Sequence, residues 1–574
     1  MKLDLRLLLA ASLAPIVGAS SSGPIVDLDY ASYQGYYENI TELNIWKGIR
    51  YASPPVGQLR WQPPTPPAKN TSQIIPAVDQ PPLCPQSGAA GTPAVYGFNS
   101  GPGDEDCLFL NVYAPPGASD LPVFVWIHGG GYGLFGAVYD PSPLMNTNNN
   151  AFITVEIQYR LGAFGFLSSA EIHNQGTPNA GLLDQRFALE WVQQYIGKFG
   201  GDPTRVTIGG ESSGAGSIIA ASPYSPPIYP YDGAVPTAYY EQFAEQAGCG
   251  PSAPARSKYQ TTFDCLVAAP SEALQNASGI VSESGLFGTF AFLPVVDGDM
   301  IQERPSVQLL NRQISGQRIL VGNNANDGVP LSNPNVVGRA AFNDYLSETF
   351  PRLTGYALTW LNLLYGTADS QPTDDGPRFD TLGTCPPTAN NQSEMATGLQ
   401  QTVFNIFAET TFDCAAQWLA EAFGAFREAW KYQYSVTPAY HGADLNAYFN
   451  LGASWPSAGF NHAFQKLWGN FIINNTPVIP LDDATANNSQ AVVPVGQNGY
   501  LDWPQFRPMS PWQMDLNTTG GTVSPVVVTP NLTYYVREGD DVVNHFRLAN
   551  ADTWEGGRGL RCAFWRAVAD LVPL

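Results

Sequence analysis

A short strand pattern that runs straight into a glycine-rich turn constrains the fold of this chain most. Arg205–Ile208 is typical of a buried strand, and Gly210–Gly214 follows it with the sequence Gly-Glu-Ser-Ser-Gly, a G-x-S-x-G motif. Small residues are needed beside the serine because the turn is so tight that larger side chains would clash, and its strain exposes the serine hydroxyl above a sheet. The pattern predicts a nucleophile elbow with Ser212 at its tip. A Ser/Gly loop without a role is the alternative.

Strand and helix patterns alternate on both sides of this turn. Apolar runs predict strands at Leu121–Ile127 and Ala151–Tyr159, and apolar residues at helical spacing predict a helix over Leu182–Phe199. Arg318–Gly322 and Trp430–Tyr434 have the same strand-then-loop character. This order predicts an α/β fold: a mainly parallel central sheet with helices on both faces and large loop insertions.

The composition is that of a globular chain with an acidic surface. Of 574 residues, 44% are hydrophobic and 13% charged, which fits a large packed core and excludes disorder. The 27 Lys and Arg residues against 49 Asp and Glu residues give a net charge of −22 at pH 7. Such a field repels phosphate backbones and anionic membrane surfaces, so nucleic acid is not expected as a partner.

The N-terminus has the parts of a secretory signal peptide. A charged start is followed by an apolar run, Leu7–Val17, and by small residues that end at Ala19. We expect residues 1–19 to be the signal peptide and residues 20–574 to form a single domain, with a buried N-terminal helix as the alternative. No later stretch reaches the ~18 apolar residues of a membrane helix, so no stable membrane anchor is expected.

Glycosylation motifs and cysteines fit a secreted chain. Cys84 and Cys107, like Cys249 and Cys265, are close enough in sequence to close short loops in an oxidising compartment, although sequence does not fix the connectivity. Three more cysteines leave one thiol over, and without a Cys-x-x-Cys pair no metal site is expected. N-glycans are expected at eight Asn-x-Ser/Thr motifs: Asn39, Asn70, Asn276, Asn391, Asn474, Asn487, Asn517 and Asn531.

The serine at the elbow needs a general base and an acid that orients it. Among five histidines, His441 lies in a loop after a strand-like run and is the predicted base. Asp327 lies in a loop after the strand pattern Arg318–Gly322. It is the predicted acid, the third member of a catalytic triad with Ser212 and His441. Asp297 is the rival acid, but its surroundings are typical of a turn in which a carboxylate caps backbone amides.

A glycine loop after another strand predicts an oxyanion hole. His128-Gly-Gly-Gly131 follows the strand pattern that ends at Ile127, and glycines let the main chain approach a substrate. The N–H groups of Gly130, Gly131 and Ser213 are the predicted donors, and His128 is expected to shape the loop.

The same loop also spells a dinucleotide fingerprint. Gly131–Gly136 reads G-x-G-x-x-G after a strand, and Glu156 follows 20 residues later. The fingerprint requires a helix that opens at the glycines, whereas the following residues are rich in Pro and Asn. We therefore expect no cofactor.

Four segments together resemble the type-B carboxylesterase/lipase family, specifically the fungal secreted branch of the α/β-hydrolases. They are Glu105–Val112, His128–Gly131, Asn179–Gln185 and Gly210–Gly214, and the similarity runs from about Trp46 to Trp565. The resemblance implies an α/β-hydrolase fold that cleaves carboxylic esters of small molecules or lipids. It also implies roles for the residues above: Ser212 as nucleophile, His441 as base, Asp327 as third member, and disulfides Cys84–Cys107 and Cys249–Cys265.

The chain departs from the family pattern at two places. Relatives usually have Glu at the position of Asp327, and Asp is one methylene shorter. Only four residues, Ile218–Ala221, separate Ser217 from Ser222, where relatives have a full helix and then another sheet strand. Either the chain reconnects unusually here, or a segment is missing from this sequence. A truncated helix would support the Ser213 donor poorly, so a catalytically impaired binding protein is the alternative function.

The segment between Cys84 and Cys107 bears on the substrate. It contains no Trp, the best aromatic face for a choline cation, so choline esters are disfavoured. Pro85–Asp106 is also short and rich in Gly, Ala and Pro, unlike the long amphipathic lid of lipase-like relatives. We expect a secreted esterase for soluble or modest-chain esters, with a lipase for longer acylglycerols as the alternative.

Overall fold

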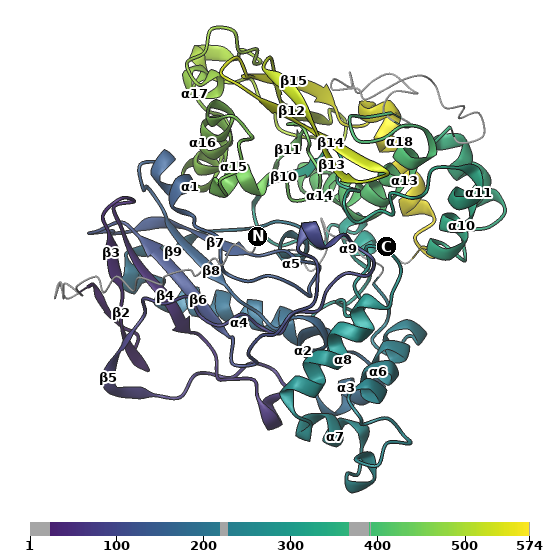
Figure 1. Cartoon of the computed structure of the whole chain (residues 1–574). Coiled ribbons are helices and arrows are strands. Elements are labelled where there is room, and N and C mark those ends of the chain that lie inside the picture. The colour runs from purple at the N-terminus through teal and green to yellow at the C-terminus, as the bar shows by residue number, and fades with distance from the viewer. Residues whose placement is uncertain (1–22, 219–227, 367–389, 391, 573–574) are drawn as a thin grey trace, which may run out of the picture.

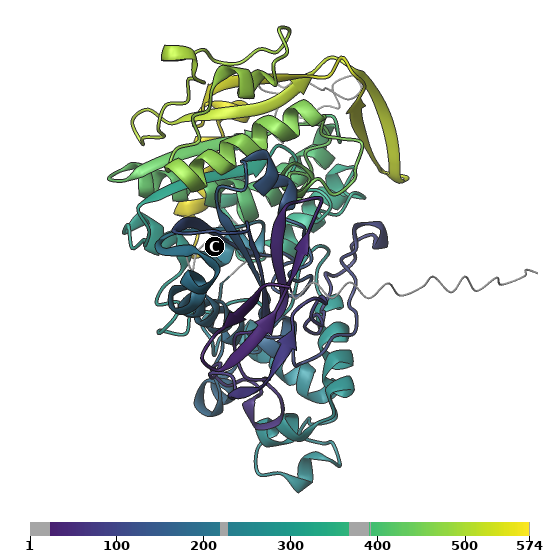
Figure 2. The same ribbon diagram turned by 90° about the vertical axis from the view of Figure 1, so that its left-hand side faces the viewer.

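The computed structural model describes residues 23–218, 228–366, 390 and 392–572. The predicted signal peptide, Cys385 and Asn391 lie outside these residues. Figure 1 shows the N-terminal strands and helices, from purple to teal, below the C-terminal ones, from green to yellow, and Figure 2 shows the same division from the side.

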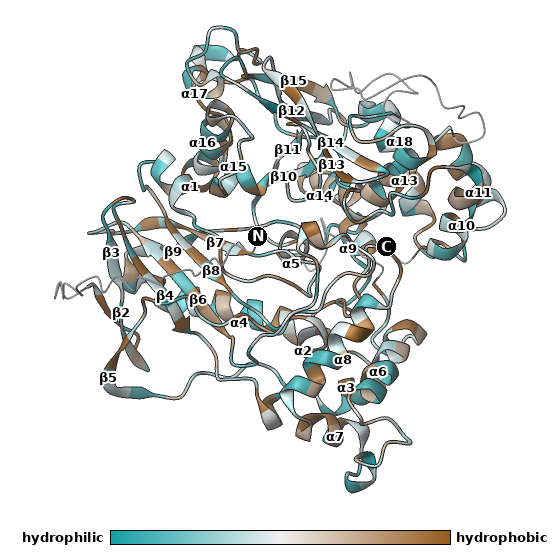
Figure 3. Cartoon of the chain, viewed as in Figure 1, coloured by the Kyte–Doolittle hydropathy of each residue, from teal (hydrophilic) through white to brown (hydrophobic). Residues whose placement is uncertain are grey.

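Six strands form the first sheet, in the order β3-β4-β6-β8-β7-β9. Strands β8, β7 and β9 run parallel, whereas β3, β4, β6 and β8 pair antiparallel. Figure 3 shows that the central strands of this sheet are largely hydrophobic, as expected for strands covered on both faces. The bounds are β3 (Tyr36–Glu38), β4 (Leu43–Arg50), β6 (Phe109–Ala114), β7 (Leu121–Ile127), β8 (Ile153–Ile157) and β9 (Gly201–Gly210).

Helix α4 (Ala180–Tyr195) is the helix predicted over Leu182–Phe199. It ends earlier than predicted because the chain tightens into a 3₁₀ turn at Ile196–Phe199, which Gly200 then closes at φ +88°. Other helices in this half are α1 (Ser142–Thr147), α2 (Gly162–Phe166), α3 (Ala170–Gln175), α6 (Ala234–Gln246), α7 (Thr262–Ala268), α8 (Ser271–Glu283) and α9 (Pro305–Leu310). A small outer sheet consists of β1 (Ile25–Asp27), β2 (Ala31–Gln34) and β5 (Asn70–Pro76).

Four strands form the second sheet, in the order β10-β11-β12-β15. The first three are parallel and β15 is antiparallel to β12. Helix α14 packs on one face, against Val321 and Ala429, and α16 packs on the other, against Leu320 and Trp430. The bounds are β10 (Arg318–Asn324), β11 (Glu428–Tyr434), β12 (Trp512–Thr519), β15 (Val543–Asn550), α14 (Cys414–Gly424) and α16 (Ala458–Asn474).

The remaining elements surround this second sheet. Strands β13 and β14 form an antiparallel hairpin. The bounds are α10 (Arg339–Thr349), α11 (Tyr356–Leu364), α13 (Gly398–Ala408), α15 (Leu445–Phe449), α17 (Leu481–Thr485), α18 (Trp554–Ala567), β13 (Thr522–Thr529) and β14 (Leu532–Glu538).

The expected central sheet is present but divided. Strand β9 ends the first sheet and β10 begins the second, and among the described residues no backbone ladder joins them. After the elbow, helix α5 (Ser213–Ile218) has only six described residues, in the region where the sequence lacks the usual helix and strand. The two sheets are held together by side chains instead: α16 packs on β11 and also on Phe124 of β7.

Three disulfides cross-link the described residues. Cys84–Cys107 and Cys249–Cys265 are the two expected pairs. The third, Cys414–Cys562, joins α14 to α18 across 148 residues of sequence. Of the glycosylation motifs in the described residues, all have an exposed asparagine except Asn517, which is buried in β12.

A buried ion pair fixes the start of α4 to the end of β8. Arg160 donates from Nε and Nη2 to the two oxygens of Asp184, each at 2.7 Å, and both side chains are buried. A buried charge that loses its partner is costly, so Arg160→Ala should lower the free energy of unfolding by about 3–5 kcal/mol. Urea denaturation measures this value.

The exposed pair Arg186–Glu190, on the same helix, is the control. Arg186→Ala should change the free energy of unfolding by less than about 0.5 kcal/mol. The double variant Arg160→Met/Asp184→Leu should recover much of the loss. Equal effects of the buried and exposed single variants would contradict this account.

Candidate active site

Ser212 stands at the end of β9 in a strained turn. Its φ is +53°, a left-handed conformation that is uncommon for a residue with a side chain. The flanking glycines are required by close contacts: a Cβ on Gly214 would lie 2.0 Å from the Ile127 carbonyl oxygen, and one on Gly210 would lie 2.6 Å from the Gly214 backbone. The turn therefore has the geometry expected of a nucleophile elbow.

The three residues expected to act together form one hydrogen-bonded chain. His441 Nε2 lies 2.9 Å from Ser212 Oγ, and His441 Nδ1 lies 3.0 Å from Asp327 Oδ1. Asp327 follows β10 and is fixed by the N–H of Asn324, which donates to Oδ2 at 2.6 Å. The shorter acid reaches the imidazole, so Asp replaces the usual Glu here without loss of the contact.

The other candidates lie elsewhere. Asp297 binds Asn179 and accepts from the Ile301 N–H, which is the capping position expected for it. The ring of His173 stacks on Tyr231. His462 lies on α16, and its Nε2 is 2.8 Å from Oδ1 of Asp483 on α17. His545 lies in β15, where it is paired with Asn517 of β12.

Two further carboxyl groups lie beside the imidazole, and neither was predicted from the sequence. Glu211 Oε1 lies 3.4 Å from His441 Nε2, and burial raises the pKa of Glu211 to about 7. Asp444 accepts a hydrogen bond from the Asn324 side chain at 3.1 Å, and burial raises its pKa to about 6. Their positions in sequence could have indicated them, since Glu211 precedes the serine and Asp444 follows His441 by three residues.

These acids determine the charge state of His441. Burial alone lowers the pKa of His441, but the charge of Glu211 and the hydrogen bond that His441 donates to Asp327 outweigh burial and raise its pKa above the ordinary 6.5. The ring of Phe412 stacks on the imidazole at 4.1 Å between centroids and covers one of its faces. The site thus favours a positive charge on His441.

The glycine loop after β7 lies directly beside the serine. A Cβ on Gly129 would lie 2.9 Å from Ser212 Cβ, and one on Gly131 would lie 2.1 Å from the Phe290 ring. Gly130 and Gly131 have φ values of +100° and +62°. Among the described residues, no group accepts a hydrogen bond from the N–H of Gly130, Gly131 or Ser213, so these donors are available to a ligand oxygen.

His128, the first residue of this loop, is held in place by contacts with Tyr159. It is buried against Tyr159, whose hydroxyl donates to the His128 carbonyl at 2.9 Å. Burial lowers the pKa of His128 to about 4, so its ring is neutral at pH 7. The glycines of the fingerprint-like sequence form turns, and the next helix, α1, begins only at Ser142. Glu156 is buried within β8, where no ribose could reach it.

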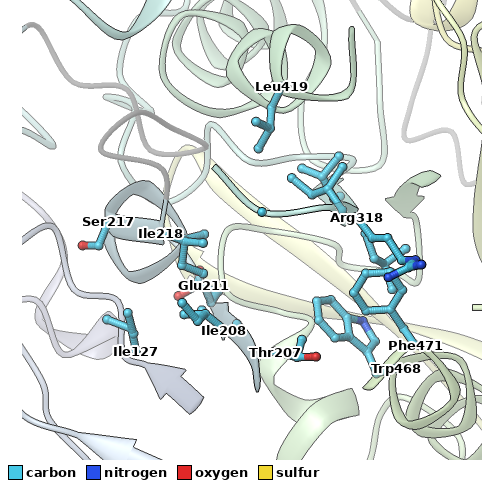
Figure 4. Close-up of a pocket in the computed structure, with 18 of the residues that line it drawn as sticks. Ile127, Thr207, Ile208, Glu211, Ser217, Ile218, Arg318, Leu419, Trp468 and Phe471 are labelled. Carbon is cyan, nitrogen blue, oxygen red and sulfur yellow. The ribbon is translucent and has the colours of Figure 1, made fainter. Parts of the chain in front are cut away.

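A cavity of about 780 Å³ lies on the sheet side of the triad. Its lining includes Ser212, Asp327 and His441, but the three predicted oxyanion donors are not among the described residues that line it. Its long walls are β9 and β10, as Figure 4 shows with Ile208 on one strand and Arg318 on the other. This cavity occupies the division between the two sheets.

Comparison with known proteins places this geometry in a family. A carboxylesterase patB of Penicillium expansum is 28% identical over 83% of this chain and 92% of its own. Secreted lipase 1 of Botryotinia fuckeliana is 32% identical over 58% of this chain and 65% of its own. The crystal structure of Aspergillus niger EstA superposes with a TM-score of 0.70 at 23% identity, over 96% of this chain and 99% of that one, which confirms the α/β-hydrolase fold.

The family model described as the carboxylesterase family matches residues 22–525, which include the elbow, the glycine loop and all three residues of the hydrogen-bonded chain. The chain therefore belongs to the carboxylesterase family of carboxylic ester hydrolases.

Proposed function

We propose that this chain is a secreted serine esterase that cleaves carboxylic esters through an acyl-enzyme on Ser212. The observation that carries the proposal is the hydrogen-bonded chain from Ser212 through His441 to Asp327 at the tip of a strained turn. This arrangement activates a serine without any added group.

The first half of the reaction follows from the contacts. His441 Nε2 takes the proton as Ser212 Oγ attacks the ester carbonyl, and Asp327 accepts from Nδ1–H and stabilises the imidazolium. The N–H groups of Gly130, Gly131 and Ser213 donate to the oxyanion, and each such donor is worth about 3 kcal/mol. The imidazolium then protonates the leaving alcohol, and the acyl group stays on Ser212.

The second half repeats these steps with water. His441, neutral again, takes a proton from a water molecule that attacks the acyl carbonyl. Collapse of the second oxyanion releases the carboxylic acid and returns the proton to Ser212. No atom of the protein is consumed.

The loop between Cys84 and Cys107 favours soluble esters of modest chain length. Its only regular element in the described residues is one 3₁₀ turn, Ala94–Tyr96, and Tyr96 packs edge-on against Tyr440 beside the catalytic histidine. A loop of this kind presents little apolar helical surface to an oil droplet. The lack of a Trp in it likewise disfavours choline esters.

Secretion is supported by several features of the chain. The described residues contain three disulfides, which persist in oxidising compartments, and exposed asparagines in six glycosylation motifs. Among the described helices, none has the length and apolar character needed to traverse a bilayer. Two similar proteins are named as secreted lipases.

The divided sheet favours a second candidate, a member of the family that binds esters but turns them over poorly. Helix α5, which carries the Ser213 donor, has only six described residues, and no strand in the described part of the chain pairs with the free edge of β9 beside it. A poorly supported elbow would misplace this donor. Labelling of the serine separates the two candidates.

Ser212→Ala should abolish ester hydrolysis while the protein stays folded. Wild-type protein should react with a fluorophosphonate probe and carry the label on the peptide that contains Ser212, and it should hydrolyse short p-nitrophenyl esters. Peptide mapping by mass spectrometry identifies the labelled residue. Residual hydrolysis at the wild-type rate in the variant would overturn the assignment, and folded wild-type protein without label would favour the second candidate.

Asp327→Asn should lower kcat by about 10⁴-fold, because the amide oxygen would stay on the Asn324 N–H and the uncharged NH2 group would donate to Nδ1, which favours the wrong imidazole tautomer. Asp297→Asn is the matched control, since Asp297 lies at a turn away from the triad. Steady-state kinetics with p-nitrophenyl acetate measures both. A wild-type rate for Asp327→Asn would transfer its role to Asp444 or Glu211.

Glu211→Gln should move the acid limb of the kcat/KM profile to lower pH. Activity requires neutral His441, so it is lost as the pH falls through the His441 pKa, and the charge of Glu211 helps to raise that pKa. Asp327 and Asp444 remain and retain part of the effect. Glu190→Gln, on the exposed face of α4, should leave the profile unchanged. A shift to higher pH would contradict the role given to Glu211.

A further inference from the structure

Two strand edges face each other across the cavity beneath the triad. Among the described residues, strand β9 pairs only with β7, and β10 pairs only with β11. Their other edges line the cavity, where Thr207 and Ile208 of β9 are half-buried (Figure 4). Each edge therefore presents backbone N–H and C=O groups to the cavity.

The two edges run in the same direction. Ser212 follows the carboxyl end of β9 and Asp327 follows the carboxyl end of β10, and both side chains contact His441. The carboxyl ends of the two strands thus lie at the same end of the cavity. A strand placed between them would extend two parallel ladders at once.

The walls above and below the cavity are apolar. Leu419 and Phe423 of α14 line one face, and Trp468 and Phe471 of α16 line the other. Figure 4 shows Leu419 on one side and Trp468 and Phe471 on the other. A strand in this position would have side chains covered on both sides. Parallel strands that are covered in this way are rich in Val, Ile and Leu along their whole length.

The size of the cavity fits one short strand. A strand residue occupies about 3.3 Å along the strand, about 4.8 Å between strands and about 10 Å through the layer, or roughly 160 Å³. A cavity of about 780 Å³ therefore holds about five residues. An acyl chain would fill the apolar volume but would leave the backbone groups of both edges without partners, which is unfavourable for buried polar groups.

We propose that the cavity between β9 and β10 binds one strand of another polypeptide, an extended apolar segment of about five residues that lies parallel to both edges. The bound strand joins the two sheets into one. This inference goes beyond the proposed function, and its test does not depend on ester hydrolysis.

The test is hydrogen exchange of the full chain with a synthetic peptide, acetyl-Lys-Val-Ile-Val-Leu-Val-Lys-amide, followed by mass spectrometry. At a peptide concentration ten times its Kd, amides in residues 204–210 and 318–324 should exchange about tenfold more slowly. The hairpin strand β14 should exchange at an unchanged rate. No protection of β9 and β10 at any soluble peptide concentration overturns the proposal.

Two controls separate strand pairing from nonspecific burial. The same peptide with N-methyl groups on alternate residues keeps its side chains but loses edge donors, and it should protect neither strand. Ile218→Trp narrows the cavity and should weaken the protection at least tenfold, whereas Ile280→Trp, at an exposed position on α8, should not. Equal protection by the methylated peptide, or protection by decanoate but not by the peptide, would show an acyl pocket and overturn the proposal.

Discussion

Two hydrogen bonds of one imidazole join strands that belong to different sheets. His441 bonds to Ser212, at the end of β9, and to Asp327, after the end of β10. Between these strands no backbone ladder runs in the described part of the chain. The catalytic geometry therefore depends on how the two sheets are placed relative to one another, and that placement depends on side-chain packing such as α16 on both sheets.

The electrostatic design of the site follows from burial. Glu211, Asp327 and Asp444 surround His441 in a volume that excludes most water, so each carboxylate acts strongly on the ring. Burial raises the pKa of Glu211 and of Asp444 and by itself lowers the pKa of His441, whereas the neighbouring acids raise the pKa of His441. The balance raises the pKa of His441, which suits a base that must take a proton from a serine hydroxyl.

Local signals explain why much of this site was predictable. The elbow, the glycine loop and the loop acid each depend on a few adjacent residues, because a tight turn requires glycine and a strand end precedes each loop. Glu211 and Asp444 lie close in sequence to Ser212 and His441, and that proximity was the one available signal. Their effect on the imidazole depends on burial beside it, which no local pattern encodes. Cys414–Cys562 was missed for a related reason: a loop of 148 residues leaves no spacing signal.

The divided sheet was predictable only in part. The short segment after Ser217 indicated that a helix and a strand were lacking, but not whether the neighbouring strands would close together. In the structure they lie apart, with side chains of α14 and α16 lining the gap between them.

A division through the middle of the sheet has a consequence for thermal inactivation. In an unbroken sheet, backbone bonds between neighbouring strands would hold the nucleophile and its base at a fixed separation until the whole sheet melts. Here that separation is set by side-chain contacts, which yield more gradually. Heating is therefore expected to open the gap between Ser212 and His441 while each sheet is still intact, so we expect the temperature of inactivation to lie below the temperature of unfolding.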